Sequence, residues 1–208
     1  MDANELAKAL SAFPAGNLCN ADPRIKALGA DIRPLSPGVG LAGPAITAEI
    51  TPGQNAAIHR AVHSAVHSAG AGQVLVVSAG GNRDYGPFGD ILASACQQKG
   101  IVGLVIDGTV RDTAEIKELG FPVFCLGANP TATTKDEPGK IDIEIACGAA
   151  RVSPGDIIVG DEDGVVVIPQ AIASDVLKKV QAIAEKEEKI KARLEAGETT
   201  CDIFNIKP

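Results

Sequence analysis

The sequence predicts a mixed α/β fold in one compact domain, and its apolar runs predict the central part of the sheet. Continuous apolar runs at 72–81 and 101–108 end in glycine, and each precedes a segment of helical character, at 86–100 and 112–120. A third apolar segment, at 121–127, follows the second helix. This β-α-β-α-β order is typical of parallel strands joined by helical crossovers.

The segments before the first of these strands are less regular. Residues 4–12 predict a short helix, and the Pro- and Gly-rich stretch at 33–40 predicts a loop. Residues 41–50 are typical of a strand, although Pro44 indicates an edge strand or a bend, because proline cannot donate to a sheet ladder. Residues 55–70 repeat apolar residues four apart and therefore predict a helix.

The second half combines short strands with a long charged helix. Residues 139–148 alternate isoleucine with acidic residues, which predicts a half-exposed strand. Residues 156–169 contain two apolar segments around an acidic turn with Gly164, which predicts a hairpin. A charged helix is expected over about 171–196, ending at Gly197. The apolar stripe of this helix consists of Val176, Val180, Ile183, Ile190 and Leu194.

Charge and cysteine content limit the possible partners. Nineteen basic and 26 acidic side chains give a net charge of −7, so neither nucleic acid nor an anionic membrane is expected as a partner. The sequence has no apolar run near membrane-helix length, and its first residues lack the features of a signal peptide, so we expect a cytoplasmic protein. The five cysteines form no C-x-x-C pair and are expected to be reduced thiols.

The main functional candidate follows the second predicted parallel strand. Arg111 and Asp112 are adjacent where an apolar run ends and a helix is expected to begin. Glu115 lies three residues after Asp112, so the D-x-x-E pattern is consistent with a capping box. In one interpretation Asp112 caps the helix and Arg111 is solvated. In the other, the two side chains bind an anionic substrate and a metal ion.

The position in the predicted sheet favours the binding interpretation, because ligands gather at the carboxyl ends of strands in α/β sheets. The neighbouring strand is followed there by a glycine-rich loop, a helix start near Gly89 that can bind a carboxylate, and Asp90. A guanidinium such as that of Arg111 binds a carboxylate through two hydrogen bonds. A carboxylate such as Asp112 binds Mg²⁺ or Mn²⁺ largely through waters. This chemistry suits a small 2-oxo acid whose carbonyl a metal polarises.

These residues also resemble a known family. Asp90 is separated from Arg111 and Asp112 by 20 residues, and this D-x20-R-D pattern lies within "GDILA…GLVIDGTVRD". It resembles the class II pyruvate aldolases of the RraA-like superfamily, which cleave 4-hydroxy-4-methyl-2-oxoglutarate and 4-carboxy-4-hydroxy-2-oxoadipate. "SPGDIIVGDEDGVVVIP" and "EKEEKIKARLEAGETT" also resemble segments of that family, so the resemblance covers nearly the whole chain.

The resemblance implies a β/β/α swivelling-domain architecture for a single domain over residues 1–208. It also implies a homo-oligomer, a trimer or a hexamer, with active sites between subunits. The residues alone leave two placements for the helix at about 171–196, which either packs on its own domain or reaches a neighbouring subunit.

The resemblance further implies roles for individual residues. Asp112 would hold the divalent metal, Mg²⁺ or Mn²⁺, and Arg111 would bind the pyruvyl carboxylate. Asp90 would position a water for proton transfer. The stretch that supplies backbone and side-chain contacts to substrate would consist of Gly89, Asp90, Ile91 and Leu92.

A glutamate from the neighbouring subunit's C-terminal helix is expected at the same site. We assign it to Glu187, with Glu185 and Glu188 as alternatives close by in the sequence. All three could equally be solvated charges of a surface helix.

The implied reaction is metal-dependent retro-aldol cleavage of a 4-hydroxy-2-oxo acid to pyruvate and a second oxo acid. Oxaloacetate decarboxylation is expected as a second activity, because it passes through the same enolate. The alternative is a non-catalytic, protein-binding regulator of the ribonuclease E activity regulator type, from the same superfamily. Retention of Asp90, Arg111 and Asp112 favours the enzyme.

Overall fold

The computed structural model describes residues 1–50, 59–133 and 139–207. Its helices are α1 (Ala3–Leu10), α2 (Ala15–Ala21), α3 (His59–Ser68), α4 (Asp90–Lys99), α5 (Thr113–Leu119), α6 (Ala173–Glu195) and α7 (Thr200–Phe204), with a 3₁₀ turn at Gln170–Ile172. Its strands are β1 (Lys26–Ala27), β2 (Arg33–Pro34), β3 (Leu41–Glu49), β4 (Val74–Ser78), β5 (Gly103–Ile106), β6 (Val123–Cys125), β7 (Lys140–Ile141), β8 (Ile145–Cys147), β9 (Ala150–Val152), β10 (Ile157–Asp161) and β11 (Gly164–Ile168).

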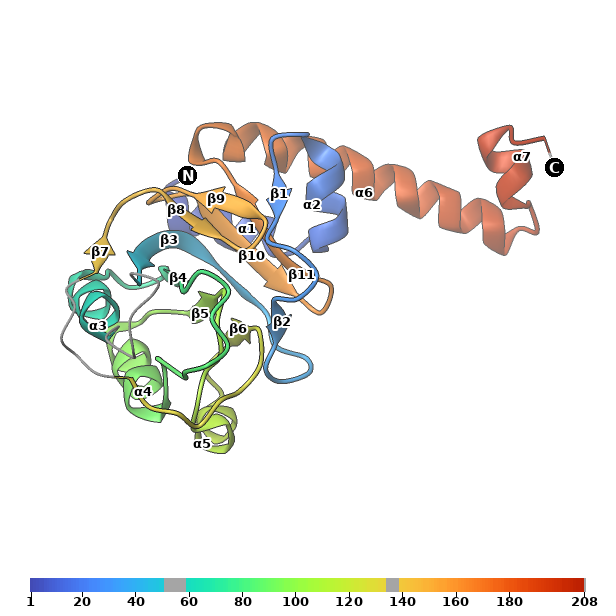
Figure 1. The fold of residues 1–208 in the computed structure, drawn as a ribbon. Coiled ribbons are helices and arrows are strands. Elements are labelled where there is room, and N and C mark those ends of the chain that lie inside the picture. Colours follow the sequence, from blue (N-terminus) through green and yellow to red (C-terminus); the bar gives the residue numbers. More distant parts are fainter. Residues whose placement is uncertain (51–58, 134–138, 208) are drawn as a thin grey trace.

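One curled sheet organises the described part of the chain, in the order β1-β11-β10-β3-β4-β5-β6-β2, with β7 also paired to β3 (Figure 1). Strands β3 to β6 run parallel, as the alternation of apolar runs and helices predicts. Helices α3, α4 and α5 cover one face of this parallel part, and the β8–β9 hairpin covers the other. Because both faces are covered, every residue of β4 and β5 is buried, which explains their continuous apolar sequences.

Strand β3 is central, so the expectation that Pro44 lies at an edge is wrong. The strand pairs antiparallel with β10 from Leu41 to Pro44 and parallel with β4 from Ala45 to Glu49. Pro44 is therefore the residue at which the strand changes partners. Its missing N–H interrupts neither ladder, because the pairing with β10 ends there and the pairing with β4 begins one residue later.

The predicted strand at 139–148 is divided into β7 and β8. Asp142 adopts a left-handed backbone conformation, with φ 56°, which an extended strand cannot contain. The side chain of Thr47 stabilises this break, because its hydroxyl donates to the carbonyl of Ile143 at 2.7 Å. The predicted hairpin at 156–169 is confirmed as β10 and β11, where Asp161 pairs with Gly164. The short elements α2, β9 and α7 were not predicted.

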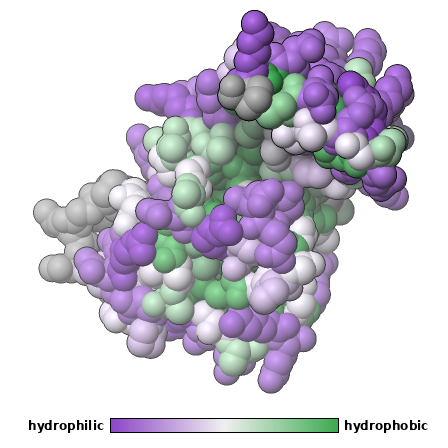
Figure 2. Space-filling view, turned by 90° about the vertical axis from the view of Figure 1, so that its right-hand side faces the viewer, coloured by the Kyte–Doolittle hydropathy of each residue, from purple (hydrophilic) through white to green (hydrophobic). Residues whose placement is uncertain are grey.

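The long C-terminal helix is confirmed, and its two halves have different surroundings. Ala173, Val176 and Val180 are buried against the β10–β11 part of the sheet. The second half extends away from the body of the protein (Figure 1). There Ile183, Ile190 and residues nearby line a cavity of about 480 Å³. Figure 2 looks at this end and shows apolar residues among the charged ones of the helices. No helix among the described residues is long and apolar enough to cross a membrane.

Asp22 anchors α6 to the end of α2 and gives a pH-dependent contribution to stability. This carboxylate is buried, and hydrogen bonds from the side chains of Arg24 and Lys179 lower its pKa well below the usual range. The ionised carboxylate therefore stabilises the fold in full above the ordinary aspartate pKa of about 3.9. This contribution begins to shrink as the pH falls below that value, and it is fully lost only below the lowered pKa of the folded state.

We therefore expect Asp22→Asn to lower the free energy of unfolding at pH 7, and the difference from the wild type to shrink by about pH 3. Urea denaturation at both pH values measures this. The exposed pair of Asp175 with Lys178 provides the control, because Asp175→Asn is expected to change stability by less than about 0.5 kcal/mol. An equal loss of unfolding free energy in Asp22→Asn at both pH values would contradict a lowered pKa for Asp22.

Candidate active site

Two loops that leave neighbouring strands converge at the carboxyl ends of β4 and β5. The first runs from Ala79 to Gly89 and leads into α4, and the second runs from Asp107 to Asp112 and leads into α5. The Arg111 N–H donates to the carbonyl of Phe88 at 2.9 Å, and the Thr109 hydroxyl donates to the carbonyl of Tyr85 at 2.6 Å. The hydrogen bonds hold the loops side by side, so the convergence expected from the sequence is observed.

Gly89 lies directly against the Arg111–Asp112 pair. A β-carbon at Gly89 would overlap Asp112 Oδ2 and would lie 3.1 Å from Arg111 Nε. Gly89 is also the residue before α4, and no side chain caps this helix start. The N-terminus of α4, with Asp90 as its first residue, thus adjoins Arg111 and Asp112. Backbone N–H groups at such a helix start favour an anion.

Asp112 does not cap α5 with its side chain, so the capping interpretation is wrong in that respect. The residue occupies the N-cap position, and its carbonyl accepts the Ile116 N–H at 3.0 Å, but its carboxylate makes no capping hydrogen bond. Its backbone is left-handed, with φ 53°, a conformation that aspartate and asparagine adopt more readily than other non-glycine residues. This conformation turns the carboxylate toward Arg111 and Gly89 instead of the helix.

Arg111 and Asp112 form a loose ion pair that leaves hydrogen-bonding capacity available. Arg111 Nε lies 3.2 Å from Asp112 Oδ2, and each side chain is about one-third exposed. The distance satisfies an ion pair, but Nε is buried and its alignment does not make a hydrogen bond. The contact is therefore electrostatic and not a hydrogen bond, because hydrogen bonds weaken steeply when bent. A buried donor without an acceptor suits a site that receives an anion.

The carboxylates at this corner also fit a hexacoordinate cation that keeps several waters. Mg²⁺ is typically bound by one or two carboxylates together with substrate oxygens. Asp112 is partly exposed and adjoins the helix that begins with Asp90. Within the described residues, no three His, Cys, Asp or Glu side chains cluster as metal ligands. This donor set therefore suits Mg²⁺ or Mn²⁺ better than a structural zinc ion, which needs four protein ligands.

The remaining residues of the α4 start have different exposures. Ile91 is largely exposed, whereas the side chain of Leu92 is buried in the core beneath α4. Leu92 can therefore offer a ligand only its backbone. Asp90 is partly exposed and accepts the Ile91 N–H at 2.7 Å.

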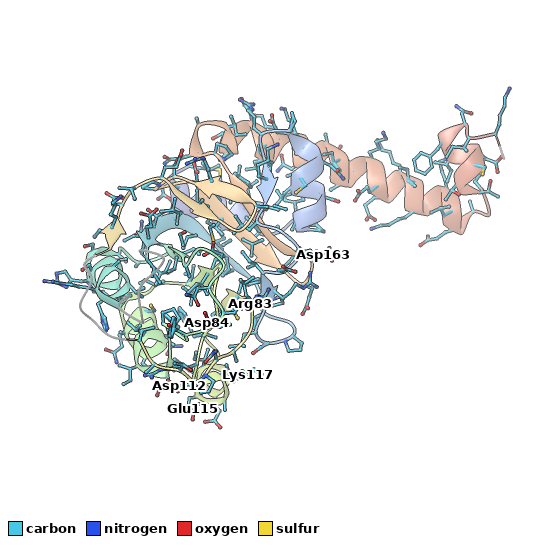
Figure 3. All side chains as sticks on the ribbon, in the orientation of Figure 1. Arg83, Asp84, Asp112, Glu115, Lys117 and Asp163 are labelled. Atoms are coloured by element: carbon cyan, nitrogen blue, oxygen red, sulfur yellow. The ribbon has the colours of Figure 1, made fainter. Side chains whose placement is uncertain are left out.

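Within one chain, the structure does not bring the candidate glutamates of α6 to this corner. Glu187 accepts a hydrogen bond from the Asn17 side chain at 2.7 Å, and Glu188 pairs with Lys191 at 2.7 Å. Glu185 is exposed. In Figure 3, Asp112 lies at the opposite end of the molecule from α6 and α7. A role for any of these glutamates in the site requires a second subunit.

Sequence reasoning missed Asp107, a buried carboxylate at the end of β5. It lines a cavity of about 690 Å³ together with Ser78 and Glu49, on the face of the sheet that β8 and β9 cover. Burial raises its pKa, and hydrogen bonds from backbone N–H groups lower it in part. The available signal was an acidic residue that directly follows the apolar run of β5.

The matched family is described as RraA-like, Aldolase/RraA, and its model covers residues 15–167. The chain belongs to the RraA-like family. A relative from Halalkalibacterium halodurans, provisionally named a 4-hydroxy-4-methyl-2-oxoglutarate aldolase, is 38% identical over 72% of this chain and 70% of its own length. The 4-hydroxy-4-methyl-2-oxoglutarate aldolase of Thermus thermophilus is 37% identical over 49% of this chain and 62% of that protein.

A solved structure confirms the fold of this RraA-like protein. Streptomyces coelicolor RraAS2, described as an unusual member of the RNase ES inhibitor RraA family, matches with a TM-score of 0.81 and 30% identity. The match covers 91% of this chain and 98% of that one. The β/β/α swivelling-domain architecture that the resemblance implies is thus confirmed, as a mixed α/β fold with a curled sheet and a C-terminal helix.

Proposed function

We propose that this RraA-like protein is a divalent-metal-dependent aldolase that cleaves a 4-hydroxy-2-oxo dicarboxylic or tricarboxylic acid to pyruvate and a second oxo acid. Oxaloacetate decarboxylation is its proposed side activity. The observation that carries the proposal is the corner itself. There the carboxylate of Asp112, which makes no capping hydrogen bond, and the Arg111 side chain, whose Nε has no hydrogen-bond acceptor, meet the start of α4 at Gly89.

Each residue at the corner has a defined task in this proposal. Arg111 binds the substrate carboxylate, and the N–H groups at the start of α4 add further donors. Asp112 holds the cation, Mg²⁺ or Mn²⁺, which when bound supplies Lewis-acid polarisation of the 2-keto group. Asp90 orients a water that accepts the proton of the C4 hydroxyl. The C3–C4 bond then breaks, and its electron pair moves into the C2–C3 bond to form the pyruvate enolate, which is protonated at C3.

A second copy of the chain is part of the proposal. In the outer half of α6, the partly exposed Ile183 and Ile190 line a cavity beside Phe204, which is half exposed. A helix with such an apolar face is stabilised by packing against another subunit. In a trimer or hexamer, the neighbouring subunit's α6 would bring Glu187 to the Arg111–Asp112 corner.

The alternative function is regulation of a ribonuclease through protein contacts, because RraAS2 is described within an RNase ES inhibitor family. The aldolase names of the two relatives support catalysis, as do the three residues Asp90, Arg111 and Asp112. The net charge of −7 gives no electrostatic attraction toward RNA.

Metal removal tests the proposed reaction. With Mg²⁺, the purified protein is expected to release pyruvate from oxaloacetate and from 4-carboxy-4-hydroxy-2-oxoadipate. Treatment with EDTA is expected to reduce the rate to that of the protein-free control, and added Mg²⁺ or Mn²⁺ should restore it. A coupled lactate dehydrogenase assay measures pyruvate, with a Mg²⁺-only control for spontaneous decarboxylation. Turnover that persists unchanged in EDTA would contradict the metal requirement, and no turnover of either acid would favour the regulator.

A further inference from the structure

Asp107 is the first residue after β5 and stands four positions before Arg111. Only 5% of this residue is exposed, and no step of the proposed reaction uses it. A buried carboxylate is costly unless hydrogen bonds compensate its lost hydration. The hydrogen-bond donors around the Asp107 carboxylate therefore indicate its structural role.

The carboxylate of Asp107 accepts hydrogen bonds from backbone groups of two other segments. Oδ1 accepts the N–H of Ala79, at the start of the loop between β4 and α4. The N–H of Gly80, in the same loop, helps to lower the pKa of this carboxyl group. Oδ2 accepts the N–H of Gly148, between β8 and β9, at 3.2 Å. One side chain thus joins the ends of β4 and β5 to the hairpin that covers them.

Main-chain contacts of Asp107 reinforce this connection. Its carbonyl accepts the Gly81 N–H at 2.9 Å, and its own N–H donates to Val77 at 3.3 Å. At the next residue, a β-carbon on Gly108 would approach the Ala79 side chain to 2.8 Å and the carbonyl of Asn82 to 3.2 Å. The two loops are therefore in close contact from their first residues.

These contacts lie upstream of the candidate active site on both loops. The first loop continues from Gly81 to Gly89, and the second continues from Asp107 to Arg111 and Asp112. Gly89 then meets Asp112 at the far ends of the loops. A shift at the beginning of either loop would change how the start of α4 faces the Arg111–Asp112 pair.

We propose that Asp107 is a positioning residue, whose ionised carboxylate holds the β4–α4 loop against the β5–α5 loop and so sets the geometry between the α4 N-terminus and the Arg111–Asp112 pair. The consequence for turnover rests on the proposed function. The connection between the loops does not rest on the proposed function, and it is tested separately.

The substitution Asp107→Asn keeps the size of the side chain and removes only the negative charge and one of the two acceptor oxygens. A carboxylate accepts at both oxygens, whereas an amide presents an NH₂ donor at one of the two positions. That donor would face the N–H of Gly148 or those of Ala79 and Gly80. The loop is therefore expected to lose at least one of its connections while the surrounding core keeps its packing.

Hydrogen–deuterium exchange followed by mass spectrometry tests the connection without any assumption about the reaction. In Asp107→Asn, peptides spanning 79–89 are expected to exchange about tenfold faster or more, equivalent to about 1.4 kcal/mol of opening free energy. Peptides from α1 and α6 should remain at wild-type rates. Asp22→Asn is the matched control, because it removes another buried carboxylate outside these loops and should leave 79–89 unchanged. Unchanged exchange at 79–89, or equal acceleration throughout the protein, would overturn the proposal.

Kinetics test the consequence for the site. With oxaloacetate and saturating Mn²⁺, Asp107→Asn is expected to lower kcat by about 10–100-fold, because small misplacements have effects of that size. The Mn²⁺ affinity, measured by electron paramagnetic resonance, should change less than threefold, since Asp112 remains. Local loosening with unchanged kinetics would overturn the positioning role. An inactive wild-type protein would reject the proposed function, and the exchange data alone would then decide whether Asp107 fixes the loops.

Discussion

Replacing Asp112 by asparagine is expected to lower metal-dependent pyruvate release by about 100-fold or more, with the fold retained. Asparagine tolerates the left-handed backbone that Asp112 adopts, so the start of α5 should keep its conformation. The amide has the same shape but no negative charge, and it cannot neutralise a divalent cation as a carboxylate does. The loss should therefore come from the metal site and not from unfolding.

Steady-state measurements over a range of Mg²⁺ concentrations check this prediction, together with the thermal unfolding midpoint of the variant. Asp163→Asn is the matched control, because Asp163 is an exposed carboxylate in the β10–β11 turn and lies apart from Asp112 (Figure 3). The control should retain wild-type turnover. If Asp112→Asn kept full metal-dependent turnover, the metal site would have to be elsewhere.

Adding a single methyl group at Gly89 is expected to reduce kcat/KM by about 100-fold. The new β-carbon of Gly89→Ala would overlap Asp112 Oδ2 and press on the Arg111 side chain. The atoms it meets are side-chain atoms, and the backbone of this segment is hydrogen-bonded to Phe88, so the methyl group is expected to displace the Asp112 carboxylate and the Arg111 side chain rather than the chain itself. Displacement of catalytic groups by about 1 Å lowers reaction rates by about this factor.

The same assay, with circular dichroism to confirm folding, checks the Gly89 variant. Gly16→Ala is the control, because no neighbouring atom lies within 4 Å of the position its β-carbon would occupy. This substitution in α2 should leave turnover unchanged and stabilise the protein by about 0.4–1 kcal/mol. Wild-type kinetics in Gly89→Ala would show that close contact between α4 and Asp112 is not needed.

The part of the fold that the sequence predicts well is the part governed by local patterns. The apolar runs of β4 and β5 reflect burial on both faces, and the helices between them follow from spacing and glycine stops. Convergence of the Gly89 and Arg111 loops was predictable because parallel strands have their carboxyl ends at one side of a sheet.

Other features depend on contacts between distant segments and could not be predicted in this way. The D-x-x-E pattern around Asp112 satisfies a capping box locally, yet its carboxylate turns to Arg111. Pro44 fits a central strand only because β3 exchanges partners beside it. Asp107 receives its hydrogen bonds from residues 28 and 41 positions away, so the apolar run before it marks a carboxylate at the end of a strand but does not reveal its partners.

The two outermost strands of the large sheet, β1 and β2, contain only two residues each. Every sheet border is a potential template for another chain, and its hazard grows with the length of unpaired backbone. Here an incoming segment would find very short templates, and the one in β2 includes Pro34, which has no N–H to donate. Within the described residues, the borders of the large sheet thus offer little unpaired backbone on which fibre-like growth could begin.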